Sequence, residues 1–287
     1  MTQLFDLQRT HNPHRFYLAV TRPLCGGTIE RPFLFGGVGI AAALEAMETT
    51  CGRPVMWITA QYVSYARLSS VVDFDVRVSA DGRHTSQARA IGHVGDQEVI
   101  VALAALGARP GGVEASWPTP PDVPPPEDCP PFPASDSADA QNVHSRFDLR
   151  LASSYGPVDG PGVDRNCHMR IWARPREGVA VDRRLLAVVG DFVSRGIRSA
   201  VNWGAGGNSL DNTIRFVTLA PTEWILCDIA IDSVWSGVVH GGMRMFSQDG
   251  VFMANTSTSL VLRAQRRSVL AGLEAHGFAH SGQAEED

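Results

Sequence analysis

The sequence predicts an α+β protein made of two similar units, each with one long helix followed by four antiparallel strands. Three observations support this fold class: helical periodicity of apolar residues in the first half, runs of β-branched residues separated by short Asp-Gly or Gly-Asp turns, and the return of the same order in the second half. With 287 residues, 44% of them hydrophobic, the chain can bury a sizeable core. Two like units in one chain also suggest a functional cleft between them.

The helix of the first half is expected to begin at Gly36-Gly37. Apolar residues recur after it at i, i+4, i+7 and i+11, and form one face: Ile40, Leu44, Met47 and Cys51. Gly52 and Pro54 end the pattern, because both residue types stop helices. The helix should therefore cover one apolar sheet face.

Four strand-like runs follow this helix, over residues 55–66, 71–80, 84–93 and 98–107. In the second run, alternate residues from Val72 to Val78 are apolar and those between them are polar, which is typical of a half-buried strand. Asp81-Gly82 and Gly95-Asp96 lie between runs as tight turns, so neighbouring strands should be antiparallel.

The second half repeats this order. A strand is expected over 169–173 and a helix over about 181–201. Four further runs begin at Ser209, Trp224, Val234 and Val251. Asp249-Gly250 closes the last hairpin.

Residues 117–133 contain nine of the eighteen prolines, which excludes regular helix or central strand there. We interpret this segment as a stiff, extended linker, although proline-rich segments also serve as SH3 ligands. The predicted organisation has four parts: a first unit over 1–112, the linker over 113–140, a second unit over 141–270, and a polar tail over 271–287.

Composition argues against several classes of protein. A net charge of -5 and a pI near 6.0 give no attraction to nucleic acid, so no nucleic-acid partner is expected. The start of the chain lacks the pattern of a signal peptide, and the longest apolar run, 99–108, is too short for a membrane span. We expect a cytoplasmic protein. Its five dispersed cysteines should be reduced thiols.

Motifs for several common chemistries are missing from the sequence. It contains no GxSxG, no GxxxxGK[ST], no HExxH, and no GxGxxG that opens a helix after a strand. The nine histidines lack ligand spacing and include no His-x4-Asp-x2-His pattern. The sequence therefore predicts no metal site and no cofactor, apart from coenzyme A as part of a substrate.

A series of short motifs resembles the TesB-type acyl-CoA thioesterases. They occur in that family's order, over roughly 15–110 and 165–263: FGG at 35–37, ADGRHTSQARA at 80–90, HMRIW at 168–172, DF at 191–192, SLD at 209–211, EW at 223–224 and QDG at 248–250. The resemblance implies a double-hotdog fold, in which each long helix is wrapped by its own antiparallel sheet and the two sheets join.

The same resemblance implies a water-activating site. The family uses an Asp, a Thr or Ser, and a Gln to hold the water; these positions fall on Asp191, on Ser209, and on Thr258, which stands where the family has Gln. The N–H groups of Gly36 and Gly37 at a helix N-terminus are suited to receive the thioester oxygen.

Each assignment has a plainer alternative. Asp191 can be an exposed or structural helix residue, Ser209 a cap or loop residue, and Thr258 an ordinary strand residue. Gly36-Gly37 can be a plain helix entry. For Asp211 we favour a solvent-facing strand position over a second site carboxylate.

The sequence thus predicts an enzyme that hydrolyses acyl-CoA to a free acid and coenzyme A with an activated water. One alternative is a hotdog protein that binds acyl thioesters, or another hydrophobic ligand, without hydrolysis. Another is a different hotdog reaction on a coenzyme A or carrier-protein ester. Acyl-CoA is the expected partner, and we expect a homo-oligomer, a dimer or larger.

Overall fold

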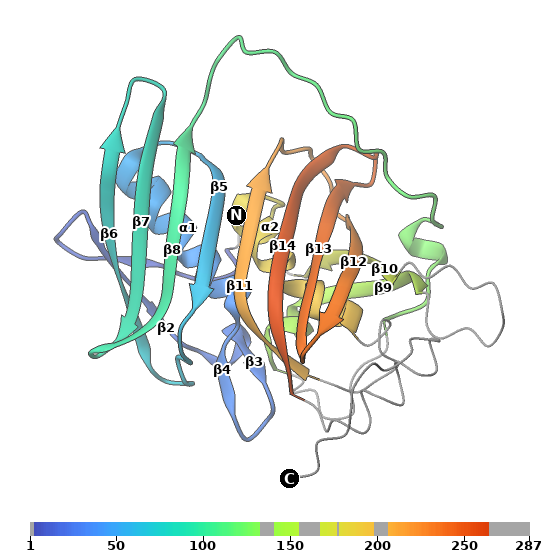
Figure 1. The fold of residues 1–287 in the computed structure, drawn as a ribbon, viewed down its shortest axis with the longest axis horizontal. Coiled ribbons are helices and arrows are strands. Elements are labelled where there is room, and N and C mark those ends of the chain that lie inside the picture. The colour runs from blue at the N-terminus through green and yellow to red at the C-terminus, as the bar shows by residue number, and fades with distance from the viewer. Residues whose placement is uncertain (1–2, 133–140, 155–166, 177, 198–205, 264–287) are drawn as a thin grey trace.

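One antiparallel sheet of twelve strands runs through both halves of the chain, in the order β1-β2-β6-β7-β8-β5-β11-β14-β13-β12-β10-β9 (Figure 1). The structure is a computed structural model, which describes all residues except 1–2, 133–140, 155–166, 177, 198–205 and 264–287. The first half contributes β1 (Gln8–Arg9), β2 (Arg15–Ala19), β3 (Cys25–Gly27), β4 (Pro32–Leu34), β5 (Val55–Tyr62), β6 (Val71–Asp81), β7 (Thr85–Val94) and β8 (Gln97–Gly107), with β3 and β4 forming a separate two-stranded sheet. The second half contributes β9 (Phe147–Ser154), β10 (His168–Pro175), β11 (Gly206–Phe216), β12 (Ile225–Trp235), β13 (Val238–Ser247) and β14 (Phe252–Arg263).

The two halves join where β5 pairs with β11. Both main helices, α1 (Gly36–Cys51) and α2 (Arg183–Val189), lie on the same side of the sheet and contact each other (Figure 1). The hydroxyls of Thr59 and Thr213 form a hydrogen bond of 2.7 Å across the junction. The predicted α+β class and the double-hotdog arrangement are confirmed.

The strands predicted for the first half agree with β5 to β8 to within a few residues. In β6, Val72 and Phe74 are buried while Asp73 is exposed, so the alternation in the sequence does mark the two faces. The predicted turns at Asp81-Gly82 and Gly95-Asp96 connect β6 to β7 and β7 to β8. Turn residues and period-2 alternation were therefore sufficient to predict these four strands from the sequence.

Ile40, Leu44 and Met47 of the predicted apolar face are buried, but the burial of α1 extends beyond that face. Ten of its residues are buried, from Gly37 to Met47 and including three successive alanines, because the helix is enclosed by the sheet on one side and by α2 on the other. On the side of α1 away from Ile40, Leu44 and Met47, small alanine side chains allow this close packing. Cys51, at the end of the predicted face, is half-buried.

The helix predicted over 181–201 is shorter than expected. Asp182 caps α2, which ends at Val189, and a 3-10 segment, η4 (Gly190–Gly196), continues in its place. The two glycines allow this segment to lie directly on the sheet: a Cβ at Gly190 would lie 3.0 Å from Thr256, and one at Gly196 would lie 2.7 Å from Ile229. The last residues of the predicted helix, 198–201, lie outside the described ranges.

Sequence patterns did not reveal β1 to β4 or β9. The first four strands have two to five residues each, too few for a period to appear. β2 extends the sheet beside β6, and β9 extends it at the other end beside β10. The predicted polar tail, 271–287, is not among the described residues.

The proline-rich segment packs onto the outer face of the second half's sheet. Trp172 donates its indole N–H to the carbonyl of Pro124 at 2.9 Å, and Pro120 lies over Gly250. A small apolar cluster forms beneath it from Cys129, Trp172, Trp224, Leu226 and Phe246. The segment, which contains the 3-10 turn η2 (Pro126–Asp128), therefore covers a sheet face as well as connecting the halves.

Candidate functional site

Asp191 occupies the contact between the two halves. It lies in η4, is only 5% exposed, and accepts a hydrogen bond on Oδ2 from the backbone N–H of Gly37 at 2.9 Å. Its other oxygen, Oδ1, accepts from the Ser209 hydroxyl at 3.4 Å. The structure thus brings together three of the predicted site residues, from α1, η4 and β11, and it rules out an exposed position for Asp191 and a loop position for Ser209.

Gly36 and Gly37 are required by this geometry. A Cβ at Gly36 would lie 2.8 Å from Asp191 Oδ2 and 2.9 Å from Tyr62 Cζ, and one at Gly37 would lie 2.6 Å from the carbonyl oxygen of Val188. All three separations are too short for a side chain. The glycine pair therefore lets α1 approach α2 closely and leaves room beside the carboxylate, which is more than a plain helix entry requires.

Burial makes Asp191 a much weaker acid than an ordinary aspartate. Loss of hydration raises the pKa of its carboxyl from the ordinary 3.8 to about 7, and the Gly37 N–H, the Asn212 amide and the Ser209 hydroxyl oppose the shift. Near neutral pH the group therefore exchanges readily between the acid and the carboxylate. A carboxylate with this pKa can accept a proton from a bound water, which suits a general base.

Two further polar residues border Asp191, and sequence patterns did not identify them. Asn212 of β11 is fully buried; its Nδ2 donates to the carbonyl of Gly190 at 3.2 Å, while its Oδ1 has no hydrogen-bond partner among the described residues. The hydroxyl of Tyr62, at the end of β5, is also buried and without such a partner. Burial raises the pKa of Tyr62 well above its ordinary value, and the Asp191 charge adds to the effect, so the phenol remains a donor.

Unsatisfied buried groups of this kind point to a ligand or a water molecule. Tyr62 Oη can donate a hydrogen bond, and Asn212 Oδ1 can accept one. The N–H of Gly36, in the first turn of α1, also makes no hydrogen bond in the part of the chain that the structure describes. The surroundings of Asp191 therefore hold a set of donors and acceptors that the protein itself leaves unused.

Thr258 lies next to this site but is already engaged. It is 4% exposed and pairs in register with Asn212 across β11 and β14, yet its hydroxyl donates to the carbonyl of Asp211 at 2.5 Å. Asp211 in turn accepts the N–H of Ser259 on Oδ1 at 2.7 Å, beside the β-bulge between Ser209 and Asp211. The hydrogen bonds of Thr258 and Asp211 thus link β11 to β14, and Asp211 is a structural residue more than a solvent-facing one.

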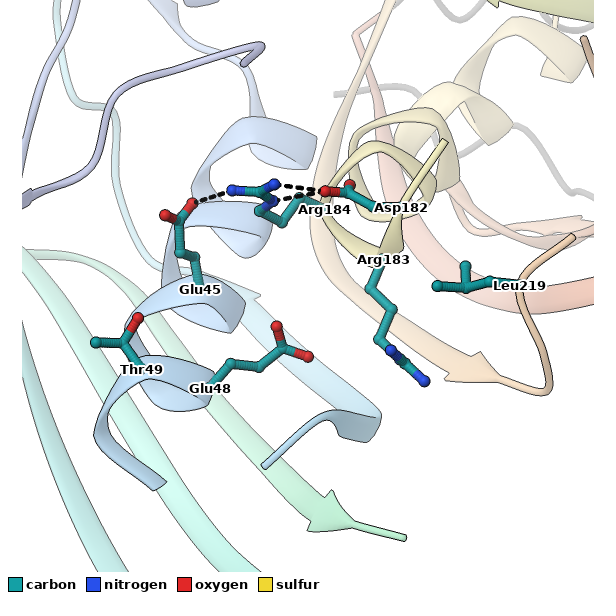
Figure 2. A pocket seen from close by; sticks show the side chains of 7 residues that line it. All are labelled: Glu45, Glu48, Thr49, Asp182, Arg183, Arg184 and Leu219. Atoms are coloured by element: carbon teal, nitrogen blue, oxygen red, sulfur yellow. Dashed lines mark hydrogen bonds and ion pairs between the residues drawn. The ribbon is translucent and has the colours of Figure 1, made fainter. Parts of the chain in front are cut away.

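A separate pocket lies at the other end of the helix pair (Figure 2). Its volume is about 270 Å³, and it is lined by Glu45, Glu48, Thr49, Asp182, Arg183, Arg184 and Leu219. Arg184 bridges Asp182 and Glu45 at 2.6 and 3.3 Å, so much of the charge is neutralised internally. Because α1 and α2 run in opposite directions here, the pocket is remote from Gly37 and does not belong to the Asp191 site.

Neither a metal centre nor a membrane span is found in the described ranges. No group of three or more His, Cys, Asp or Glu side chains there is arranged to hold a metal ion. No helix there is both long and apolar enough to cross a membrane.

Comparison with known proteins links this geometry to one family. Residues 126–262 match the family model described as the acyl-CoA thioesterase C-terminal domain. A solved structure from Novosphingobium aromaticivorans, described as a candidate thioesterase, is 33% identical; the alignment covers 90% of this chain and 98% of that one, with a TM-score of 0.81. A search of curated proteins gave no match.

More distant solved structures share the fold. A TesB protein from Mycobacterium avium subspecies paratuberculosis is 18% identical, over 91% of this chain and 97% of that one, with a TM-score of 0.73. A hotdog-fold protein of unknown function from Alicyclobacillus acidocaldarius is 19% identical, over 91% and 96%, with a TM-score of 0.78. The architecture therefore extends over nearly the whole chain.

Proposed function

The chain belongs to the TesB-type acyl-CoA thioesterase family, and we propose that it hydrolyses an acyl-CoA to the free acid and coenzyme A at Asp191. One observation carries this proposal. A buried carboxylate with a pKa of about 7 lies beside the N-terminus of α1, a phenol and an amide oxygen, and the last two have no hydrogen-bond partner among the described residues. Hydrolysis of a thioester requires a base for water and donors for the developing oxyanion, and these groups can supply both.

In this mechanism the attacking water hydrogen-bonds to Asp191 and to Oδ1 of Asn212. Ser209 and the Gly37 N–H hold the carboxylate in place. Asp191 takes a proton from the water as its oxygen attacks the thioester carbon. The bond to sulfur then breaks, the proton on Asp191 passes to the departing thiolate, and the products are a carboxylic acid and coenzyme A.

The oxyanion of the tetrahedral intermediate is held by the Gly36 N–H and by Tyr62 Oη. The amide of Gly37 was expected to share this task, but it donates to Asp191 instead. Tyr62 suits the role because its hydroxyl is buried and, although Asn212 lies beside it, makes no hydrogen bond of normal geometry among the described residues. Such donors lower the barrier because they are already oriented before charge develops.

A free-thiol release assay tests the proposal. Short, long, branched and aromatic acyl-CoAs are compared for the parent, for Asp191→Asn, and for the control Asp232→Asn, which changes an exposed carboxylate on β12. We expect release by the parent and the control, and a loss of at least about 100-fold in kcat for Asp191→Asn. Equal rates for Asp191→Asn and the parent would show that another group activates the water.

One observation favours the non-hydrolytic alternative. Thr258 stands where the family has Gln, and its hydroxyl is already committed to Asp211. If no acyl-CoA releases thiol above background while binding is measurable by calorimetry, the protein binds acyl thioesters without hydrolysing them.

A further inference from the structure

Arg195 has no counter-charge among the residues that the structure describes. It lies in η4, four residues after Asp191, with its guanidinium 5.0 Å from the ring centre of Phe132 and 5.1 Å from that of Phe192. Its Nε is buried, and the side chain makes no hydrogen bond or ion pair within the described part of the chain. The residue as a whole is only half-buried, so a ligand can reach it from solvent.

The described titratable groups around Arg195 are Cys227 and His144, and they do not neutralise it. Burial raises the pKa of the Cys227 thiol, which therefore stays uncharged. Burial, followed by the nearby Arg195 charge, lowers the pKa of His144 to about 3, so this imidazole is neutral as well. Burial also lowers the pKa of Arg195 itself, to about 10, and the guanidinium remains charged at neutral pH.

The cost of burying the Arg195 charge exceeds what its ring contacts return, which also points to an anionic ligand. Burying an ion without a partner costs several kcal/mol, whereas a cation–π contact returns about 0.5 to 2 kcal/mol. A structural role for Arg195 would be better filled by an apolar side chain of similar length. A ligand that brings an anionic oxygen would satisfy the guanidinium, since its planar fork matches a carboxylate.

Arg195 lies on the same 3-10 segment as Asp191. Four residues of 3-10 segment rise about 8 Å along the axis. Phe192 lies between the two residues in sequence, and its ring is 6.0 Å from that of Phe35, which precedes Gly36. The His144 ring is 5.1 Å from Phe35 and 5.5 Å from Phe192, with a buried Nδ1 that has no hydrogen-bond partner among the described residues. These rings, of which Phe35 and Phe192 are buried in the core, thus form an aromatic cluster between the N-terminus of α1 and η4.

We propose that Arg195 binds a carboxylate carried on the acyl group, so that the preferred substrates are acidic acyl-CoAs such as dicarboxylic monothioesters. This inference rests on the proposed hydrolysis at Asp191. The phosphates of coenzyme A are a poorer match, because the whole pantetheine arm separates them from the thioester. A distal carboxylate only a few carbons from the thioester fits the spacing.

The experiment compares glutaryl-CoA and adipyl-CoA with neutral hexanoyl-CoA and heptanoyl-CoA in the thiol-release assay. Arg195→Met keeps the length of the apolar stem and removes the charge; Arg215→Met removes an exposed charge on β11 and is the control. In Arg195→Met, kcat/KM for the acidic substrates should fall about 10- to 100-fold, the loss of a charge-assisted hydrogen bond, and the neutral substrates should change less than about twofold. An unchanged ratio of acidic to neutral kcat/KM would overturn the proposal.

Pantetheine thioesters of the same acids distinguish the two sources of the anion. Arg195→Met could lower kcat/KM equally for acidic and neutral acyl-CoAs but leave kcat/KM for the pantetheine thioesters unchanged. That result would assign Arg195 to a phosphate and contradict the acyl proposal. If Arg195→Met does not fold, Arg195→Lys replaces it: this variant keeps the charge but loses the fork, and it should lose part of the acidic preference.

A binding measurement separates this inference from the hydrolysis proposal. Glutarate should raise the Tm of the parent and of Arg215→Met, but not that of Arg195→Met, and butyrate should raise none of them. If no thioester is hydrolysed while glutarate still stabilises the parent through Arg195, the anion site stands and the hydrolysis proposal fails. If thiol is released but glutarate has no effect that depends on Arg195, the anion site is refuted.

Discussion

At the scale of single residues, the site depends on one carboxylate held where water hydrates it poorly. Asp191 is stabilised by the Gly37 N–H and the Ser209 hydroxyl, but the loss of hydration outweighs both, and its pKa rises to about 7. A group shifted in this direction opposes folding when it is ionised. The protein therefore carries a destabilising charge at the position where a base is useful.

The stability of Asp191→Asn should reveal this effect. The folded pKa is above the unfolded one, so folding takes up a proton, and stability falls as pH rises from about 4 to about 7. Relative to the parent, Asp191→Asn should gain about 2 to 3 kcal/mol more in free energy of unfolding at pH 8 than at pH 5. Urea unfolding at the two pH values measures the difference. A difference that does not change with pH would mean that Asp191 ionises normally in the folded state.

Tyr62→Phe separates an oxyanion donor from a structural hydroxyl. Its hydroxyl has no partner in the described structure, so its removal should leave the free energy of unfolding unchanged or slightly raised. As a donor to the transition state, it should contribute about 10- to 100-fold in kcat, with KM little changed. Loss of stability with unchanged kcat would identify Tyr62 as a structural residue instead.

Residue roles were only partly predictable from sequence. Asp191 and Ser209 fell on family motifs, and the structure brings them into contact. Asn212 carried no signal, because the β-bulge after Ser209 shifts which residues face inward. Tyr62 was missed because its importance depends on the register of β5 with β11, which local patterns do not contain.

At the scale of elements, the site depends on how closely α1 approaches α2 and η4. The backbone of Val188 leaves no room for a side chain at Gly37. The same contact places the first turn of α1 against Asp191. Helix packing and the site geometry therefore depend on the same pair of glycines.

Gly37→Ala and Gly52→Ala should differ in their effect on activity. Gly52 ends α1 at φ 64° with no atom near a would-be Cβ, so alanine there should cost about 1 kcal/mol without changing kcat. Alanine at 37 forces the two helices apart, which should cost about 1 to 3 kcal/mol and lower kcat at least tenfold. Thermal unfolding and thiol release, compared at equal folded fraction, test this. Full kcat in Gly37→Ala would show that the close helix contact is unnecessary for the reaction.

Elements with strong local signals could be predicted, and those set by packing could not. The alternation in β6 and the turns on either side of β7 were correct because each depends on nearby residues. The change from α2 to η4 was missed, since it reflects glycines lying against Thr256 and Ile229 on distant strands. The docking of the proline-rich segment likewise depends on Trp172, far along the chain.

At the scale of the whole molecule, neither half contains the site alone. The first half supplies the amides of α1 and Tyr62, and the second supplies Asp191, Ser209 and Asn212. Pairing of β5 with β11 fixes one set against the other. The duplicated architecture was visible in the repeated order of helix and strands, but its joining into one sheet followed only from the family resemblance.

The pH dependence of kcat/KM for thiol release tests the central claim most directly, because it reports the base in the free enzyme. If Asp191 activates the water, kcat/KM should rise with pH through a pKa of about 7 and then level off. In Asp191→Asn, kcat/KM should be far lower than in the parent and should not show this rise. A profile that is flat from pH 5.5 to 8.5, or one that Asp191→Asn reproduces, would contradict the claim that this buried carboxylate drives hydrolysis.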